Sequence, residues 1–129
     1  MKIQVKTEVD VSMTDLANLL CNAFEGGIGY WAVITGYTKP EKVWTNKDWE
    51  SGTPRYIHYP LSEGGAVRLR DAEDEETEWT LDLPAIKRGL AIMAEKYPRH
   101  WKNFAEDYAD AETGDVLVQC ALMGELVYG

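Results

Sequence analysis

Two sets of side chains in this sequence have the types and spacing for binding chemistry, and the first is a run of acids. Six of the eight residues from Asp71 to Glu78 are acidic. Such a block of like charge repels itself and stays in water. It forms either a solvated hairpin tip or an anionic contact that imitates a phosphate track. The candidate partner-binding residues are Asp71, Glu73, Asp74, Glu75, Glu76 and Glu78.

The second set is aromatic and polar and comes from both ends of the chain. Asp115 and Gln119 are four residues apart in an apolar segment, so they share one stripe of a helix. The stripe is either the hydrogen-bonded edge of a buried helix or the lining of a cleft beside Tyr30 and Trp31. Aromatic rings with a few polar groups can hold a base or nucleotide. The candidate ligand-binding residues are Tyr30, Trp31, Trp44, Trp49, Asp115 and Gln119.

Catalytic and metal-binding patterns are missing from the sequence. The two histidines, His58 and His100, have no partner at metal-ligand spacing, and each is expected to be exposed or half-buried. Carboxylates that could hold Mg²⁺ are abundant, but no spacing singles out a set. No Gly-x-Ser-x-Gly, Walker or His-Glu-x-x-His motif occurs. We therefore expect no enzyme activity, no cofactor and no metal. Cys21 and Cys120 lie in apolar helical patterns and are expected to be free buried thiols, with a disulfide or a reactive thiol as the alternatives.

The stretch "EGGIGYW" at residues 25–31 superficially resembles a phosphate-binding glycine loop. In the dinucleotide fingerprint the glycines lie between a strand and the start of a helix. Here they follow a helical pattern, so the helix dipole has the wrong direction for phosphate. We interpret Gly26 as a left-handed residue just after a helix that ends at Glu25. Tyr30 and Trp31 would then open a strand and point to opposite faces.

Composition limits the classes of protein that the chain can represent. Its 129 residues fit one domain, residues 1–129, and 45 % of them are apolar. The net charge of −9 argues against direct binding of nucleic acid. It also argues against an anionic ligand, unless Arg55, Arg68 or Arg70 lies close to the site. Neither a signal peptide nor an apolar run of membrane-spanning length occurs. We therefore expect a soluble intracellular protein without membrane contact.

The residue patterns predict an α+β fold. Strands are expected over 2–9, 30–37, 55–61, 65–72 and 76–83, with a hairpin around "SEGG" at 62–65 and a long loop over 38–54. Helices are expected over 12–25, 84–97 and 99–108, and an all-round apolar one from Thr113 to Gly124. The final "ELVYG" is either a short strand or an extended tail. Together these elements predict an antiparallel sheet of about 4–6 strands with three or four helices packed on one face.

Blocks at both ends of the chain resemble a group of small acidic proteins encoded by phages and prophages. "DLANLLCNAFEGGIGYW" at 15–31 carries a Glu-Gly-Gly-x-x-Tyr-Trp pattern, and "DAETGDVLVQCALMGELVYG" at 110–129 carries Asp-Ala-x-Thr-x-Asp-x-x-x-Gln before Tyr-Gly. The segment "LAIMAEKYPRHW" at 90–101 also resembles the group, whereas residues 36–80 do not. The family has no established activity, so the resemblance implies an origin rather than a mechanism.

A phage origin favours a function by binding in the cytoplasm of the infected bacterial host. The leading hypothesis is an accessory protein whose acidic surface inhibits a host protein, such as a nucleic-acid-binding complex of a defence or CRISPR system. The alternatives are a protein that binds a nucleotide-like ligand in an aromatic pocket, and an oligomeric structural or assembly component. In the last case the apolar C-terminal helix would be the seam of a homodimer.

Overall fold

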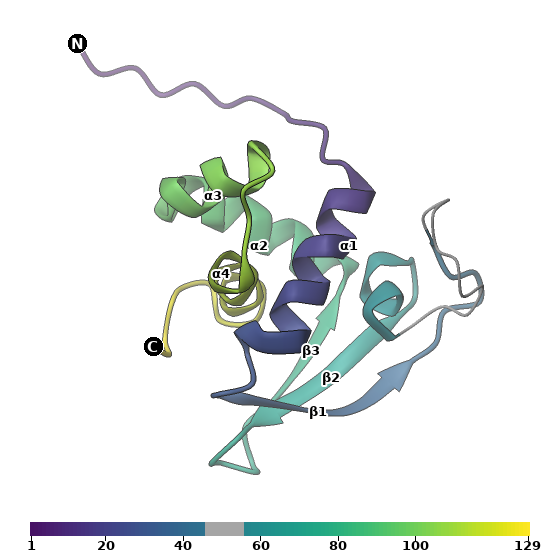
Figure 1. Cartoon of the computed structure of the whole chain (residues 1–129). Helices are drawn as coiled ribbons and strands as arrows, with labels where there is room; N and C mark the ends of the chain where they lie inside the picture. The colour runs from purple at the N-terminus through teal and green to yellow at the C-terminus, as the bar shows by residue number, and fades with distance from the viewer. Residues whose placement is uncertain (46–55) are drawn as a thin grey trace.

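The chain forms an α+β domain, as its residue patterns predict. The computed structural model describes residues 1–45 and 56–129. Its helices are α1 (Met13–Asn22), α2 (Leu83–Lys96), α3 (Pro98–Ala105) and α4 (Ala111–Met123), with a π-helical turn η1 (Ala23–Gly27) and a 3₁₀ helix η2 (Tyr56–Leu61). Its strands are β1 (Ala32–Thr38), β2 (Ala66–Asp71) and β3 (Glu78–Asp82). Figure 1 shows the helices gathered on one side of the sheet.

The sheet in the described residues has three antiparallel strands in the order β1-β2-β3, fewer than the 4–6 that the patterns predict. Val67 on β2 lies opposite Tyr37 on β1 and Leu81 on β3. A bulge interrupts β1 between Ile34 and Gly36. The strands expected at 30–37, 65–72 and 76–83 are therefore present, although β1 begins two residues later than expected.

The strand expected at residues 2–9 is absent. This segment is extended and exposed, with Ile3 and Val5 72 % and 75 % accessible, and it runs away from the body of the molecule (Figure 1). Alternation of apolar and polar residues describes a side-chain pattern, but a strand also needs a neighbour to pair with. The described part of the sheet supplies no partner for this segment.

The prediction of a strand over 55–61 is also wrong, because Tyr56–Leu61 forms the 3₁₀ helix η2. Pro60 lies within it and has no N–H to donate to a sheet ladder. The "SEGG" turn consequently joins η2 to β2 and does not close a hairpin; Gly64 there takes a positive φ of 84°. The hairpin of this domain is instead β2–β3, and its tip is the acidic run.

Helix α4 is the centre of the helical layer. Every residue from Thr113 to Ala121 is buried, and the helix packs on α1, η1, α2, α3 and β3. The all-round apolar pattern therefore marks the core of this chain, in which the residues of α4 from Thr113 to Ala121 are already covered. Beneath it, Val67, Leu69 and Leu81 of the sheet and Leu19, Leu20 and Ile86 of the helices complete the same core.

Helix ends follow local capping chemistry. The oxygens of Ser12, Asp82 and Asp110 accept backbone N–H groups at the starts of α1, α2 and α4. Gly124 ends α4 in the left-handed conformation with φ 77°, and the chain after it is an extended tail. At the end of α1, the expectation of a left-handed Gly26 is wrong. The helix continues into η1, where Ile28 N–H donates to Ala23 C=O at 3.0 Å.

Candidate functional site

The candidate site is a groove of about 670 Å³ beside the first turns of α4. Four parts of the chain form its walls: η1 with Tyr30, the start of α3, the start of α4 and the C-terminal tail. The groove therefore joins the two sequence blocks on which the family resemblance rests. Its lining residues are Gly26, Gly27, Tyr30, Tyr97, Pro98, Arg99, His100, Ala111, Glu112, Asp115, Val116, Leu126, Tyr128 and Gly129.

Asp115 is the polar centre of one wall. Its Oδ2 accepts the Tyr30 hydroxyl at 2.6 Å, and its Oδ1 accepts Trp31 Nε1–H at 2.8 Å and Gln119 Nε2–H at 2.9 Å. The side chain is only 8 % exposed. Burial of the hydroxyl and the adjacent Asp115 carboxylate raise the pKa of Tyr30 to about 12. Tyr30 is consequently a hydrogen-bond donor throughout the physiological pH range.

Gln119 extends this network to the C-terminal tail. Its Oε1 accepts the backbone N–H groups of Val127 and Tyr128 at 2.8 and 2.9 Å. The ring of Tyr128 stacks on Trp31 with centroids 4.9 Å apart and planes at 7°. The pair Asp115 and Gln119 therefore ties together Tyr30, Trp31 and the tail, and this structural role accounts for most of its hydrogen-bonding capacity.

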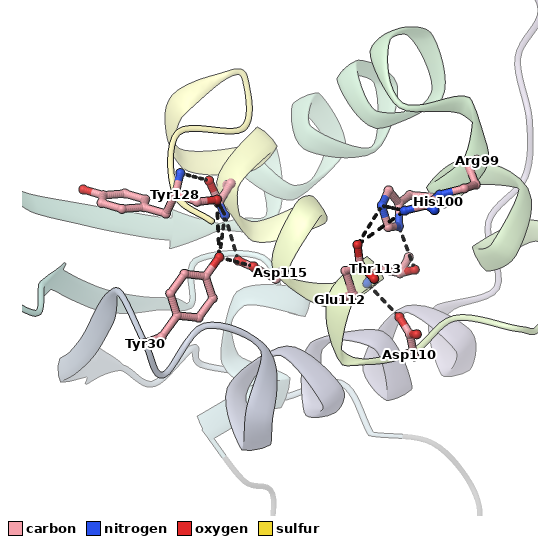
Figure 2. A network of polar contacts seen from close by, with 9 residues as sticks. Tyr30, Arg99, His100, Asp110, Glu112, Thr113, Asp115 and Tyr128 are labelled. Atoms are coloured by element: carbon pink, nitrogen blue, oxygen red, sulfur yellow. Dashed lines mark hydrogen bonds and ion pairs between the residues drawn. The ribbon is translucent and has the colours of Figure 1, made fainter.

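A second polar group lies at the other end of the groove, as Figure 2 shows. His100 is 7 % exposed; its Nδ1 lies 3.0 Å from Thr113 Oγ1, and its Nε2 lies 3.2 Å from Arg99 NH2. Arg99 also pairs with Glu112 at 3.3 Å. The backbone N–H of Thr113, donated to the Asp110 carboxylate at 3.0 Å, is the main cause that lowers the pKa of Asp110.

The structure brings some of the predicted ligand residues together and separates others. Tyr30, Trp31, Asp115 and Gln119 meet in one network, although Tyr30 and Trp31 precede β1 instead of pointing to opposite faces of it. Trp31 is 2 % exposed and covered by Tyr128, so it cannot stack on a ligand. Trp44 lies elsewhere, with its backbone N–H donated to Ser62 Oγ. Trp49 lies outside the described residues.

The arginines proposed to accompany an anionic ligand do not line the groove. Arg68 donates to Thr38 Oγ1 and to the Tyr37 carbonyl across the sheet, and Arg70 donates to the Asp71 carbonyl. Arg55 lies outside the described residues. Arg68 and Arg70 therefore supply no phosphate contact at Tyr30 or Asp115, and the arginine that does line the groove, Arg99, pairs with Glu112.

The acidic run forms an ordered turn between β2 and β3. Asp71 Oδ1 accepts the N–H groups of Glu73 and Asp74 at 2.7 and 2.9 Å, while Asp74 Oδ2 accepts the hydroxyl of Thr77 at 2.6 Å. The Tyr128 hydroxyl donates to Asp71 Oδ2. That bond is the largest cause lowering the pKa of Asp71. Asp71 and Asp74 thus build the turn and tie it to the tail.

Four other acidic side chains of the turn project into solvent. They are exposed, and within residues 1–45 and 56–129 their carboxylates make no hydrogen bond or ion pair. These residues are Glu73, Glu75, Glu76 and Glu78.

Sequence reasoning misses Tyr128, which connects the turn, the Trp31 ring and the groove. The terminal Tyr-Gly of the C-terminal block is its only sequence signal. The expectation that both histidines are exposed or half-buried is wrong, because His58 and His100 are buried. His100 is satisfied by Thr113 and Arg99, and His58 packs near the Trp44 ring.

Neither cysteine forms a disulfide. Burial raises the pKa of the Cys120 thiol to about 11, as expected for a small buried hydrophobe, and Cys21 is half-buried. In the described part of the chain, no group of three or more His, Cys, Asp or Glu is placed to hold a metal ion. The helices of that same part are too short or too polar for a bilayer crossing.

Comparison with known proteins found no protein-family model, curated protein or solved structure that matches this chain.

Proposed function

We propose that this protein is a phage-encoded accessory protein that acts by binding and not by catalysis, and that its acidic turn contacts a basic host protein. The observation that carries this proposal is the construction of residues 71–78. Two carboxylates, Asp71 and Asp74, hold the turn in one shape, and Tyr128 anchors it to the tail. The remaining carboxylates are then displayed on a preformed scaffold.

A contact surface that is already ordered binds more tightly, because ordering a surface on binding costs free energy. A disordered acidic run would lose conformational entropy when bound, whereas this turn is already ordered by its own hydrogen bonds. Closely spaced carboxylates offer a basic groove the same sign of charge as a phosphate backbone. A nucleic-acid-binding complex of a host defence system, such as a CRISPR effector, is the class of partner that this surface fits. The resemblance to phage proteins supports the same assignment.

The test is capture of a host protein at two salt concentrations. The tagged protein is incubated with bacterial host lysate at about 50 mM and about 300 mM salt, between which the screening length shortens substantially. We expect a partner that is retained at low salt and released at high salt. The test variant replaces four acids with glutamine: Glu73→Gln, Glu75→Gln, Glu76→Gln and Glu78→Gln.

A control with the same change of net charge separates the turn from general acidity. It replaces four exposed acids outside the turn: Glu41→Gln, Glu63→Gln, Glu95→Gln and Glu106→Gln. We expect the turn variant to lose the partner and the control to retain it. Equal capture by wild type and the turn variant, or equal loss in both variants, would contradict the proposal.

The groove favours a second candidate, a small-ligand protein, because Tyr30, Asp115 and Tyr128 converge on a cavity of ligand size. The burial of Trp31 and the engagement of Arg68 and Arg70 elsewhere do not favour a stacked anionic nucleotide there. A thermal-shift screen of nucleotides and of small amines distinguishes these ligand classes, since a ligand at a hundredfold excess over its Kd stabilises by about 2.7 kcal/mol.

A further inference from the structure

We propose that the groove binds a cationic group, an alkylammonium or a guanidinium, against the Asp115 carboxylate. Asp115 lines the groove yet is more than nine-tenths buried. A buried carboxylate is costly unless a cation accompanies it. In the described part of the chain, no lysine, arginine or histidine forms an ion pair with Asp115. Its present partners are the neutral groups of Tyr30, Trp31 and Gln119.

The other charged groups of the groove compensate one another. Arg99 pairs with Glu112 at 3.3 Å, and the same guanidinium lies 3.2 Å from His100 Nε2. Glu112 also lies 3.8 Å from that nitrogen. The charge that remains without a counterion on the groove wall is therefore negative and belongs to Asp115.

Hydrogen-bond capacity at Asp115 points to the same class of ligand. The Tyr30 hydroxyl proton and the Trp31 indole N–H are already donated to the carboxylate. Gln119 uses its amide hydrogens on Asp115 and on the Tyr128 carbonyl, at 2.9 and 3.2 Å. Oδ2 accepts only the Tyr30 hydroxyl and retains an acceptor position. This end of the groove can therefore accept a proton donor but has no donor left for an anion.

Aromatic rings complete a site of this type. Tyr30, Tyr97 and Tyr128 line the groove, and Tyr30 is 55 % exposed. The face of a tyrosine ring attracts an ammonium or guanidinium. The ring walls and the carboxylate thus favour a compact cation carried on an alkyl chain, which is the form of a lysine or arginine side chain.

We assign the occupant to a lysine or arginine of the basic partner, and this part of the inference rests on the proposed function. The groove and the acidic turn are neighbours through a single residue. Tyr128 lines the groove and donates its hydroxyl to Asp71 in the turn. A basic protein bound to the turn would therefore have the groove within reach of an adjacent side chain. A free amine has the same chemistry, and the experiment separates the two sources.

The direct test is an NMR titration of the intact ¹⁵N-labelled protein. Butylammonium and ethylguanidinium are the probes, with sodium acetate and sodium phosphate as anion controls at the same ionic strength. The Trp31 indole N–H is the reporter because it donates to the same carboxylate. We expect a saturable shift of its resonance with both cations and not with the controls. No saturable shift with the cations, or a larger one with phosphate, would overturn the inference.

Two variants test the role of the carboxylate. Asp115→Asn keeps the shape but removes the charge, and we expect it to weaken cation binding about tenfold or more, as charged hydrogen bonds usually contribute. Tyr30→Phe removes one donor from Oδ2 and retains the carboxylate, so it should bind the cations at least as tightly. Weakening of the same size in Tyr30→Phe would overturn the assignment to Asp115, and this holds even if Asp115→Asn fails to fold.

The source of the cation is decided by repeating the host-lysate capture with Asp115→Asn. A weaker capture, together with competition by butylammonium, assigns the occupant to the partner protein. If butylammonium binds the free protein but capture is unchanged, a free amine is the occupant and the partner assignment is overturned. If the turn variant loses the partner and Asp115→Asn retains it, the proposed function is supported and this inference is not. If the cations bind but no partner is captured, the cation site in the groove is supported and the proposed function is not.

Discussion

At the scale of single residues, two tyrosines donate hydrogen bonds to carboxylates close to the C-terminal tail. Tyr30 donates to Asp115, and Tyr128 donates to Asp71. Burial is the largest cause that raises the pKa of Tyr30 to about 12, while for Tyr128 the bond to Asp71 raises it to about 12. In the unfolded chain both phenols have a pKa near 10. Folding therefore favours the protonated form of each.

The sign of this linkage predicts a loss of stability in alkali. The tyrosine contribution to the free energy of unfolding is complete below about pH 10 and is lost as pH rises toward about 12, because the unfolded state releases its protons first. Urea unfolding at several pH values between 9 and 12 measures this loss. The double variant Tyr30→Phe/Tyr128→Phe should lose less stability over that interval than wild type.

A third tyrosine serves as the control for this experiment. Tyr108 is 76 % exposed, so Tyr108→Phe should show the same alkaline loss as wild type. If the double variant and wild type lose equal stability between pH 9 and 12, the two hydrogen bonds do not favour the protonated phenols as argued.

At the scale of elements, α4 is buried because glycines let its neighbours approach closely. A Cβ on Gly114 would lie 2.9 Å from the Ala23 nitrogen and 2.9 Å from the Leu19 oxygen, which are backbone atoms of α1 and η1. Backbone atoms at a packed crossing have little freedom to move. This close approach of η1 and α4 also brings Tyr30, which follows η1, to Asp115 on α4.

Gly114→Ala is therefore expected to destabilise the protein by about 1–3 kcal/mol, as overpacking in a core usually does. Gly26→Ala is the matched control. A Cβ there would have no atom within 4 Å, and the residue lacks a positive φ. It should leave stability unchanged or raise it by about 0.4–1 kcal/mol. Denaturant unfolding of both variants measures the difference, and equal effects would show that the α1–α4 approach is not tight.

Local sequence patterns predict some of the helices and strands but not others. Leu16, Leu19 and Leu20 repeat at helical spacing behind Ser12, so α1 follows from local pattern and capping. β2 and β3 alternate and flank turn-forming acids. Residues 2–9 alternate equally well but have no strand beside them among residues 1–45 and 56–129. Pro60 lies in Tyr56–Leu61 and has no N–H to donate to a sheet ladder. Strand formation depends on a partner, which a local pattern does not contain.

At the scale of the whole molecule, we expect the N-terminal segment to add little to the stability of the folded body. Ile3 and Val5 are largely exposed, and Thr7 and Val9 are the first residues to line a groove against α2. Deleting residues 2–6 should therefore change the free energy of unfolding by no more than about 0.5 kcal/mol, as for other exposed surface changes. Thermal or urea unfolding of the truncated chain measures this, and a loss of several kcal/mol would mean that the segment pairs within the fold.

The sequence by itself determined the α+β class of fold, the approximate positions of the four helices and of strands β1, β2 and β3, and the placing of Asp115 and Gln119 on one stripe of α4. Those features depend on neighbours a few residues apart. The tertiary structure alone decided that Tyr128 links the acidic turn to the groove, that both histidines are buried, and that Trp31 is covered while Tyr30 remains exposed. These outcomes depend on contacts between residues as many as 98 positions apart along the chain, such as Tyr30 and Tyr128, and no local pattern carries that information.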